Sequence, residues 1–225
     1  TKPDDPRAYE LDDYVADLEE LRAHLGLEQL QLLGHSHGGV VAIVYAARHP
    51  DRVERLILAS TLARFSPEQE RAMAEAVERS AAEPWYEDAR AALEAESAGD
   101  FDSDEELGEL ALREFPFYFA RYGDDERAYL ETLRSEIPNA DALRLFNTEQ
   151  VPVFDLRPEL KRITAPTLVI AGADDFITGP PSAAEIGEGI AGSRTVLLPN
   201  TGHFVFVEAP EAFREAVLAF LGVGA

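Results

Sequence analysis

The sequence contains no cysteine and only two lysines, Lys2 and Lys161. Without cysteine, the chain can form no disulfide, no zinc–thiolate site and no thiol nucleophile. No apolar run approaches the length of a membrane span, and no cationic and then apolar leader opens the chain, so we expect no membrane contact and a cytoplasmic location. Metal-ligand spacings, phosphate-binding glycine loops and dinucleotide fingerprints are also missing, so we predict neither a metal nor a cofactor.

Positive charge is scarce. The chain has 43 acidic residues and 20 lysines and arginines, which gives a formal net charge of −23. Such a field repels phosphates, which argues against nucleic acid or an anionic lipid surface as a partner. Many of the acids lie between residues 83 and 109. They could attract a cationic substrate or reflect adaptation to salt, but we favour the interpretation that they form a solvated helical face that keeps the protein soluble.

The most informative stretch is the hexapeptide Gly34-His35-Ser36-His37-Gly38-Gly39, which lies between two apolar runs. This pattern predicts a strand, a sharp turn and a helix, with a strained and exposed serine on the turn. We expect Gly34 and Gly38 to be required because a Cβ atom would clash where strand and helix approach each other. The amide groups at the start of the helix would face a developing oxyanion.

Two later strands end in residues that complete this chemistry. The run 167–171 leads to Asp174 and Asp175, and the run 195–198 leads to His203. The carboxyl ends of strands in an open α/β sheet form one edge, and sites form there. The chain order serine, aspartate, histidine is that of the α/β-hydrolase triad rather than those of chymotrypsin or subtilisin.

The periodicity divides the chain into a core and an insertion. We predict helices at 11–25, 182–190 and 210–221, and strands at 30–33, 53–59, 167–171 and 195–198. Residues 62–152 are helical in pattern, acidic and alanine-rich, with aromatic patches at 84–86 and 115–119. We therefore assign 1–61 and 153–225 to the core and 62–152 to a helical cap. The aromatic patches could line the substrate pocket or form the cap's own core.

Together these segments resemble the α/β-hydrolase superfamily, and most closely its proline iminopeptidase-like branch. Three stretches carry the resemblance: GHSHGG at 34–39, the segment from Leu156 to Asp175, and the segment from Gly202 to Glu211. The resemblance implies an α/β-hydrolase fold with a mostly parallel sheet and an inserted helical cap. It also implies Ser36 as nucleophile, His203 as base, Asp175 as the carboxylate, and His37 and Gly38 as oxyanion- or substrate-binding residues.

Several neighbouring residues compete for these roles. Asp174 is the alternative carboxylate, and Glu208 is a weaker alternative because Asp175 fits the strand end better. His35 is expected to pack under the turn, and His37 lies on the pocket side. His24 and His49 are expected at helix ends, as surface or capping residues.

The expected function is hydrolysis of a small ester or amide through an acyl-enzyme, with a small molecule or short peptide as substrate. An aminopeptidase of the proline iminopeptidase type is one form of it, since such enzymes use cap acids to hold the substrate's amino group. Esterase, lactonase and carbon–carbon bond hydrolase activities fit the same triad, and a non-catalytic ligand-binding protein of this fold is a further alternative. Haloalkane dehalogenases and epoxide hydrolases are disfavoured, since they use Asp where this chain has Ser36.

The resemblance also implies strands that this sequence lacks. Such hydrolases have several strands, and a His-Gly-rich loop with a second oxyanion donor, before the helix that begins here at residue 11. We expect the chain to be part of a longer hydrolase, or to pair with a separate N-terminal polypeptide that completes the sheet. A sheet of four strands would otherwise leave one edge uncovered.

Overall fold

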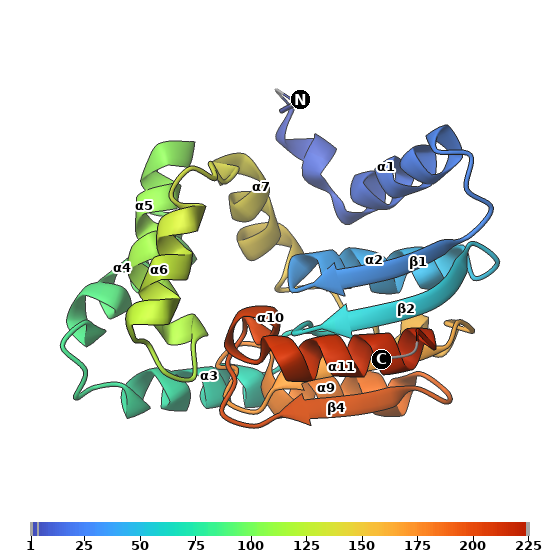
Figure 1. Ribbon diagram of the computed structural model, residues 1–225. Coiled ribbons are helices and arrows are strands. Elements are labelled where there is room, and N and C mark those ends of the chain that lie inside the picture. Colours follow the sequence, from blue (N-terminus) through green and yellow to red (C-terminus); the bar gives the residue numbers. More distant parts are fainter. Residues whose placement is uncertain (1, 4, 224–225) are drawn as a thin grey trace.

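The computed structural model describes residues 2–3 and 5–223 and contains a central sheet of four parallel strands (Figure 1). The strands are β1 (Leu30–His35), β2 (Val53–Ala59), β3 (Thr167–Gly172) and β4 (Arg194–Leu198). They lie side by side in chain order, and each pairs in parallel with the next. The four predicted strands are thus present, each within one or two residues of its expected bounds.

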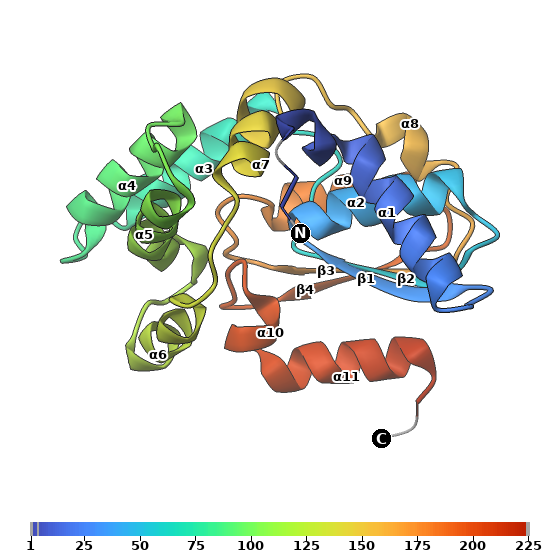
Figure 2. The ribbon, with the colours of Figure 1, turned by 90° about the horizontal axis from the view of Figure 1, so that it is seen from above.

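Helices cover both faces of this sheet. Figure 2 shows α11 on one face and α1, α2, α8 and α9 on the other. The predicted helix at 210–221 has those bounds as α11, and the helix expected at 182–190 begins three residues earlier. The bounds are α1 (Leu11–His24), α2 (His37–Arg48), α8 (Arg157–Leu160), α9 (Gly179–Gly189), α10 (Val205–Glu208) and α11 (Pro210–Leu221).

Alternation along β2 explains why both faces need cover. Leu56 and Leu58 belong to the large core that β2 shares with α2, whereas Ile57 and Ala59 belong to a second core against α11. Successive side chains of a strand point to opposite faces, so an apolar run such as Val53–Ala59 must be buried on both. The apolar helix α2 packs on one side, and Phe213, among other residues of α11, packs on the other.

The segment between β2 and β3 forms a helical cap, which lies to one side of the sheet in Figure 1. No strand occurs among its described residues, as predicted; Arg64 and Asp155 form one isolated bridge where the chain leaves the core and returns. The cap elements are α3 (Pro67–Arg79), α4 (Tyr86–Ala98), α5 (Asp104–Glu114), the 3-10 turn η2 (Phe115–Tyr118), α6 (Asp124–Leu133), α7 (Ala140–Leu145) and the π-helical turn η3 (Phe146–Gln150). A further 3-10 turn, η1 (Pro6–Tyr9), precedes α1.

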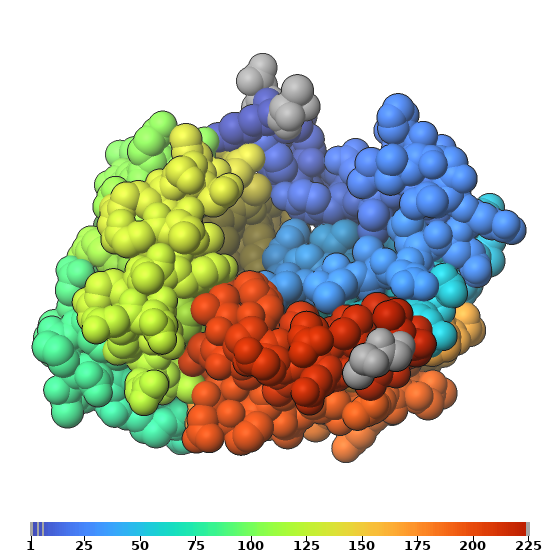
Figure 3. All heavy atoms as spheres, viewed as in Figure 1, coloured from blue at the N-terminus to red at the C-terminus, as the bar shows by residue number. Residues whose placement is uncertain are grey.

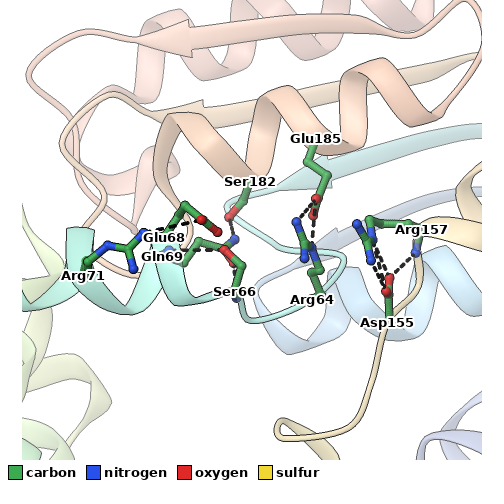
Figure 4. A network of polar contacts seen from close by, with 9 residues as sticks. All are labelled: Arg64, Ser66, Glu68, Gln69, Arg71, Asp155, Arg157, Ser182 and Glu185. Atoms are coloured by element: carbon green, nitrogen blue, oxygen red, sulfur yellow. Dashed lines mark hydrogen bonds and ion pairs between the residues drawn. The ribbon is translucent and has the colours of Figure 1, made fainter.

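Polar contacts anchor the base of the cap to α9 (Figure 4). Ser66 and Gln69 form a capping box at the start of α3, and Gln69 also donates to Ser182 of α9. Arg64 pairs with Glu185 of α9 at 2.9 Å. The capping box satisfies orphan amides of α3 and, through Ser182, fixes the beginning of this helix to the core.

The aromatic patches of the cap pack against aromatic residues of the core. Tyr86 and Phe117 are buried together with Phe176, which follows β3. Phe119 is buried in a second cluster with Phe204, next to the predicted histidine. Most of the rings are thus buried where the cap meets the core, and the lining of a substrate pocket by these patches stays a prediction.

Candidate active site

Ser36 stands between β1 and α2 in a strained backbone conformation. Its φ is 53° and its ψ is −123°, a region that non-glycine residues rarely adopt. Its N–H lies 3.1 Å from the carbonyl oxygens of both Ala59 and Ser60, and its own carbonyl oxygen accepts from Oγ1 of Thr61 at 2.7 Å. The chain after β2 therefore holds the strained turn in place, as predicted for a nucleophile turn.

Close packing requires glycine at two positions around the turn, and only one of them is a position that was expected. A Cβ atom on Gly34 would lie 2.4 Å from the carbonyl oxygen of Gly38, so the prediction for Gly34 is correct. A Cβ atom on Gly38 would meet nothing within 4 Å, so the expected clash at Gly38 is wrong. The second tight position is Gly39, where a Cβ atom would lie 2.5 Å from the side chain of Thr61. The helix thus approaches β1 at Gly34 and the β2 loop at Gly39.

Asp175 and His203 form a buried pair at the carboxyl edge of the sheet. Nδ1 of His203 lies 3.0 Å from Oδ2 of Asp175. Oδ1 of Asp175 accepts from the backbone N–H groups of Ile177 and Thr178, each at 3.0 Å, and Oδ2 also accepts from the Thr178 hydroxyl. Burial by itself raises the pKa of Asp175, but His203 and these hydrogen bonds outweigh it and lower the pKa to about 2.

The competing carboxylates lie elsewhere. Asp174 is exposed, and its N–H donates to the carbonyl oxygen of Thr201 at 2.9 Å. Glu208 accepts from the backbone N–H groups of Gly202 and Ala120. The geometry therefore favours Asp175 as the partner of the His203 ring.

His35 connects the serine turn to the histidine loop. Its ring lies 4.8 Å from that of His203 between centroids, and its Nε2 lies 3.1 Å from the carbonyl oxygen of His203. Burial, together with the charge of His203, lowers the pKa of His35 to about 4, so this ring is neutral at pH 7. The residue next to Ser36 thus packs directly on His203, which places the serine turn and the histidine loop at the same sheet edge.

His37 and Gly38 begin α2 beside the serine. The His37 ring packs between Tyr14 of α1, at 5.2 Å, and Phe146 of the cap, at 4.7 Å. Burial lowers the pKa of His37. Gly38 is exposed. Figure 3 shows a hollow in the surface between the cap and the α1–α2 region. Oxyanion binding by the two residues stays a prediction.

The remaining histidines behave as surface residues. His24 is exposed in the last turn of α1, and His49 follows α2 with its ring 4.9 Å from that of Tyr45.

Among the described residues, no group of three or more potential ligands is arranged to hold a metal ion. In the same part of the chain, no helix is both long and apolar enough to cross a membrane.

A buried acidic cluster in the cap was not predicted. Glu114, at the end of α5, is 2% exposed; its Oε1 accepts from the Tyr118 hydroxyl at 3.2 Å, while its Oε2 has no hydrogen-bond partner. Glu96 of α4 is also buried, and Nδ2 of Asn147 donates to it at 2.9 Å. Burial and the nearby Glu96 raise the pKa of Glu114 to about 9. The signal in the sequence was the spacing of Leu107, Leu110 and Glu114, which places this glutamate on the apolar face of α5.

The cluster is linked to the Asp175–His203 pair through Tyr118. The Tyr118 ring contacts that of His203 edge-on at 5.4 Å, and its carbonyl oxygen accepts from the His203 N–H at 2.7 Å. One side of Tyr118 therefore contacts the predicted base, and its hydroxyl contacts Glu114. Tyr118 thus links the buried carboxylate of the cap to the Asp175–His203 pair at the sheet edge.

Comparison with known proteins agrees with this architecture. The model of the alpha/beta hydrolase fold family matches residues 1–210. A proline iminopeptidase of Pestalotiopsis fici is 31% identical over 210 residues, which make up 92% of this chain and 71% of that protein. The crystal structure of a hydrolase from Pseudomonas aeruginosa is 33% identical with a TM-score of 0.71, covering 99% of this chain and 75% of that one. The enol-lactonase from Burkholderia xenovorans is 28% identical with a TM-score of 0.69, covering 98% and 75%.

The chain therefore belongs to the alpha/beta hydrolase fold family. Within it, the chain lies in the proline iminopeptidase-like branch and is a hydrolase.

Proposed function

We propose that the protein is a serine hydrolase in which Ser36, His203 and Asp175 form the triad. The Oγ atom of Ser36 attacks the substrate carbonyl carbon while its proton passes to Nε2 of His203. His203 then gives this proton to the leaving group, and an acyl-enzyme on Ser36 remains. Water attacks the acyl carbon with His203 again as base, which releases the acid and restores the Ser36 hydroxyl.

Asp175 and the start of α2 assist these steps. With its pKa at about 2, Asp175 is ionised at neutral pH and holds Nδ1–H of His203, so that Nε2 faces Ser36 and the imidazolium is stabilised. We assign the backbone N–H of His37, the first residue of α2, as one donor to the developing oxyanion, and the exposed Gly38 beside it as part of the substrate-binding surface. No step requires a cofactor.

We further propose that the substrate carries a free N-terminal amine, as in an aminopeptidase of the proline iminopeptidase type. The observation that carries this proposal is the buried Glu114, whose Oε2 has no partner although the site lies next to the triad. A buried carboxylate of this kind is costly unless a cation or a proton compensates it. The ammonium group of a substrate would supply that charge, with Glu96 and the Tyr118 hydroxyl beside it.

The similarity to the Pestalotiopsis fici proline iminopeptidase supports proline as the N-terminal residue. The second candidate is a lactonase or esterase, supported by the similarity to the Burkholderia xenovorans enol-lactonase. An ester or lactone needs no partner for Glu114, which would then be protonated at neutral pH, consistent with its pKa of about 9. The two candidates differ in whether a free amine on the substrate increases the rate of hydrolysis.

The test compares two anilides in the natural polypeptide that carries this sequence. Proline p-nitroanilide contains the ring amine, whereas cyclopentanecarboxylic p-nitroanilide has the same shape without it. We expect kcat/KM to be at least tenfold higher for the proline compound, and Glu114→Gln to remove this advantage, since a hydrogen bond to a charged group contributes about 1.5–3 kcal/mol. Glu105→Gln, on the exposed face of the same helix, is the control.

Equal rates on both anilides, with the Gln variant behaving like the control, would contradict the amine proposal and favour the lactonase or esterase. A fluorophosphonate probe addresses the nucleophile separately. It should modify Ser36, and the Ser36→Ala variant should be neither modified nor active. Retained activity in that variant would rule out Ser36 as the nucleophile.

A further inference from the structure

The loop that carries His203 runs directly against the cap. The N–H of His203 donates to the Tyr118 carbonyl oxygen at 2.7 Å. A Cβ atom on Gly202 would lie 2.4 Å from that same oxygen and 2.8 Å from the backbone nitrogen of Ala120. Backbone packs on backbone here, so the position of the predicted base depends on the position of the 118–120 segment.

One carboxylate joins the two segments. Glu208, the last residue of α10, accepts from the Gly202 N–H through Oε2 at 2.6 Å and from the Ala120 N–H through Oε1 at 2.8 Å. Gly202 belongs to the loop after β4, and Ala120 belongs to the cap. Hydrogen bonds from amides to an ionised carboxylate are short and strong, so this residue ties the cap to the histidine loop.

Apolar contacts hold the other side of the same junction. Phe204, adjacent to His203, packs on Phe115 at 5.6 Å, on Tyr118 at 5.8 Å and on Phe119 at 5.2 Å. These rings pack the apolar side of the junction, and Glu208 makes the hydrogen bonds on its polar side. Nothing in the apolar cluster can replace the two acceptors that the Gly202 and Ala120 amides need.

We propose that Glu208 is a positioning residue that fixes the His203 loop to residues 118–120 of the cap. The alignment of His203 as the base then depends on the cap being packed against this loop. This proposal rests on the hydrolytic role of Ser36 and His203 argued above. Tyr118 contacts both Glu114 and His203. Glu208 bonds to Ala120 in the same segment, so this segment links a substrate amine at Glu114 to the base at His203. Glu208 touches no reacting atom and acts through the His203 loop.

The discriminating variant is Glu208→Gln. Its amide offers one acceptor oxygen, so one of the two backbone N–H groups loses its partner and faces an NH₂ group, while side-chain volume is unchanged. We expect kcat per active site, counted by titration with a fluorophosphonate, to fall at least tenfold with KM within about twofold, because binding groups stay in place while His203 shifts. Glu211→Gln, exposed on α11, should match the wild type.

Hydrogen–deuterium exchange gives a readout that does not require turnover. Amides of 118–122 and 202–204 should exchange faster together in Glu208→Gln, and should be unchanged in the Glu211→Gln control. A variant with wild-type kcat per titrated site, or with exchange altered in only one of the two segments, would overturn the proposal. If instead the wild type is neither modified at Ser36 nor active, the proposed function fails, while the exchange result still tests the tie.

Discussion

Ser36 illustrates how a short motif dictates local structure. A strained φ of 53° is maintained because Gly34 permits close approach of α2, and because the Thr61 hydroxyl and the Ala59 carbonyl oxygen bond to the serine backbone. The spacing of the glycines predicted the turn, but the assignment of the second tight position to Gly38 was wrong. Thr61, which makes Gly39 the tight position, comes from another strand end and has no signature in the motif.

The choice between Asp174 and Asp175 gives a prediction at the residue scale. Asp175→Asn removes the charge that stabilises the His203 imidazolium and allows the wrong tautomer, so we expect kcat to fall by roughly a thousandfold or more. Asp174→Asn alters an exposed side chain and should leave kcat within about twofold of the wild type. Steady-state kinetics on purified variants with matched circular dichroism spectra measure both. The reverse order of the two losses would assign the role to Asp174.

At the scale of elements, the buried Gln69 bonds the start of α3 to α9, beside the apolar contacts of α3 with Phe176. Gln69 accepts from the Ser66 N–H at 2.6 Å and donates to Ser182 of α9, and it is 5% exposed. The capping box was readable as the pattern Ser66-Pro67-Glu68-Gln69, but its use as an anchor to α9 was not. Ser182 lies over a hundred positions later in the chain.

We expect Gln69→Ala to lower the free energy of unfolding by about 1–3 kcal/mol, because it leaves Ser66 and Ser182 with unsatisfied buried groups. Urea denaturation followed by circular dichroism measures this value. The control is Arg71→Ala on the exposed side of the same helix, with an expected effect within about 0.5 kcal/mol. Equal losses for both variants would mean that α3 is held by its own helical contacts.

At the scale of the whole molecule, the balance of buried acids sets the response of stability to pH. The pKa of Glu114 is raised to about 9 from an ordinary value of 4.5, so the folded state binds this proton more tightly than the unfolded state. Its contribution is fully present below pH 4.5 and is lost as pH rises toward 9. Asp175 acts in the opposite direction, since its pKa falls from 3.8 to about 2 and its contribution is lost as pH falls through that window.

The expected outcome is that the free energy of unfolding decreases between about pH 6.5 and pH 9, above the range in which the lowered pKa of His35 acts in the opposite direction, and that Glu114→Gln makes this decrease shallower. Denaturation curves at a series of pH values, with Glu105→Gln as the control, measure the slope. An unchanged slope in Glu114→Gln would show that Glu114 does not hold a proton in the folded state.

The sequence by itself determined the fold class and the strands of the core, and it indicated the candidate site residues. Apolar runs with defined ends predicted the four strands, helical spacing predicted α1 and α11, and Ser36, Asp175 and His203 each followed a strand in the expected order. These features are local, because apolar strand runs, helix periodicity and a glycine-bounded turn each depend on residues close together in the sequence. The two buried aromatic patches were also visible, although their role was not.

Only the tertiary structure decided which distant residues share the site. Glu114 is linked to the Asp175–His203 pair because Tyr118 contacts His203, and Glu208 bonds to the Gly202 and Ala120 amides because the cap folds back onto the loop after β4. The bond between Ala120 and Glu208 joins segments 88 positions apart, and no pattern within either segment encodes the other. A buried carboxylate can bind a cation or join two loops by hydrogen bonds. Its role depends on its spatial neighbours, and only the fold brings these together.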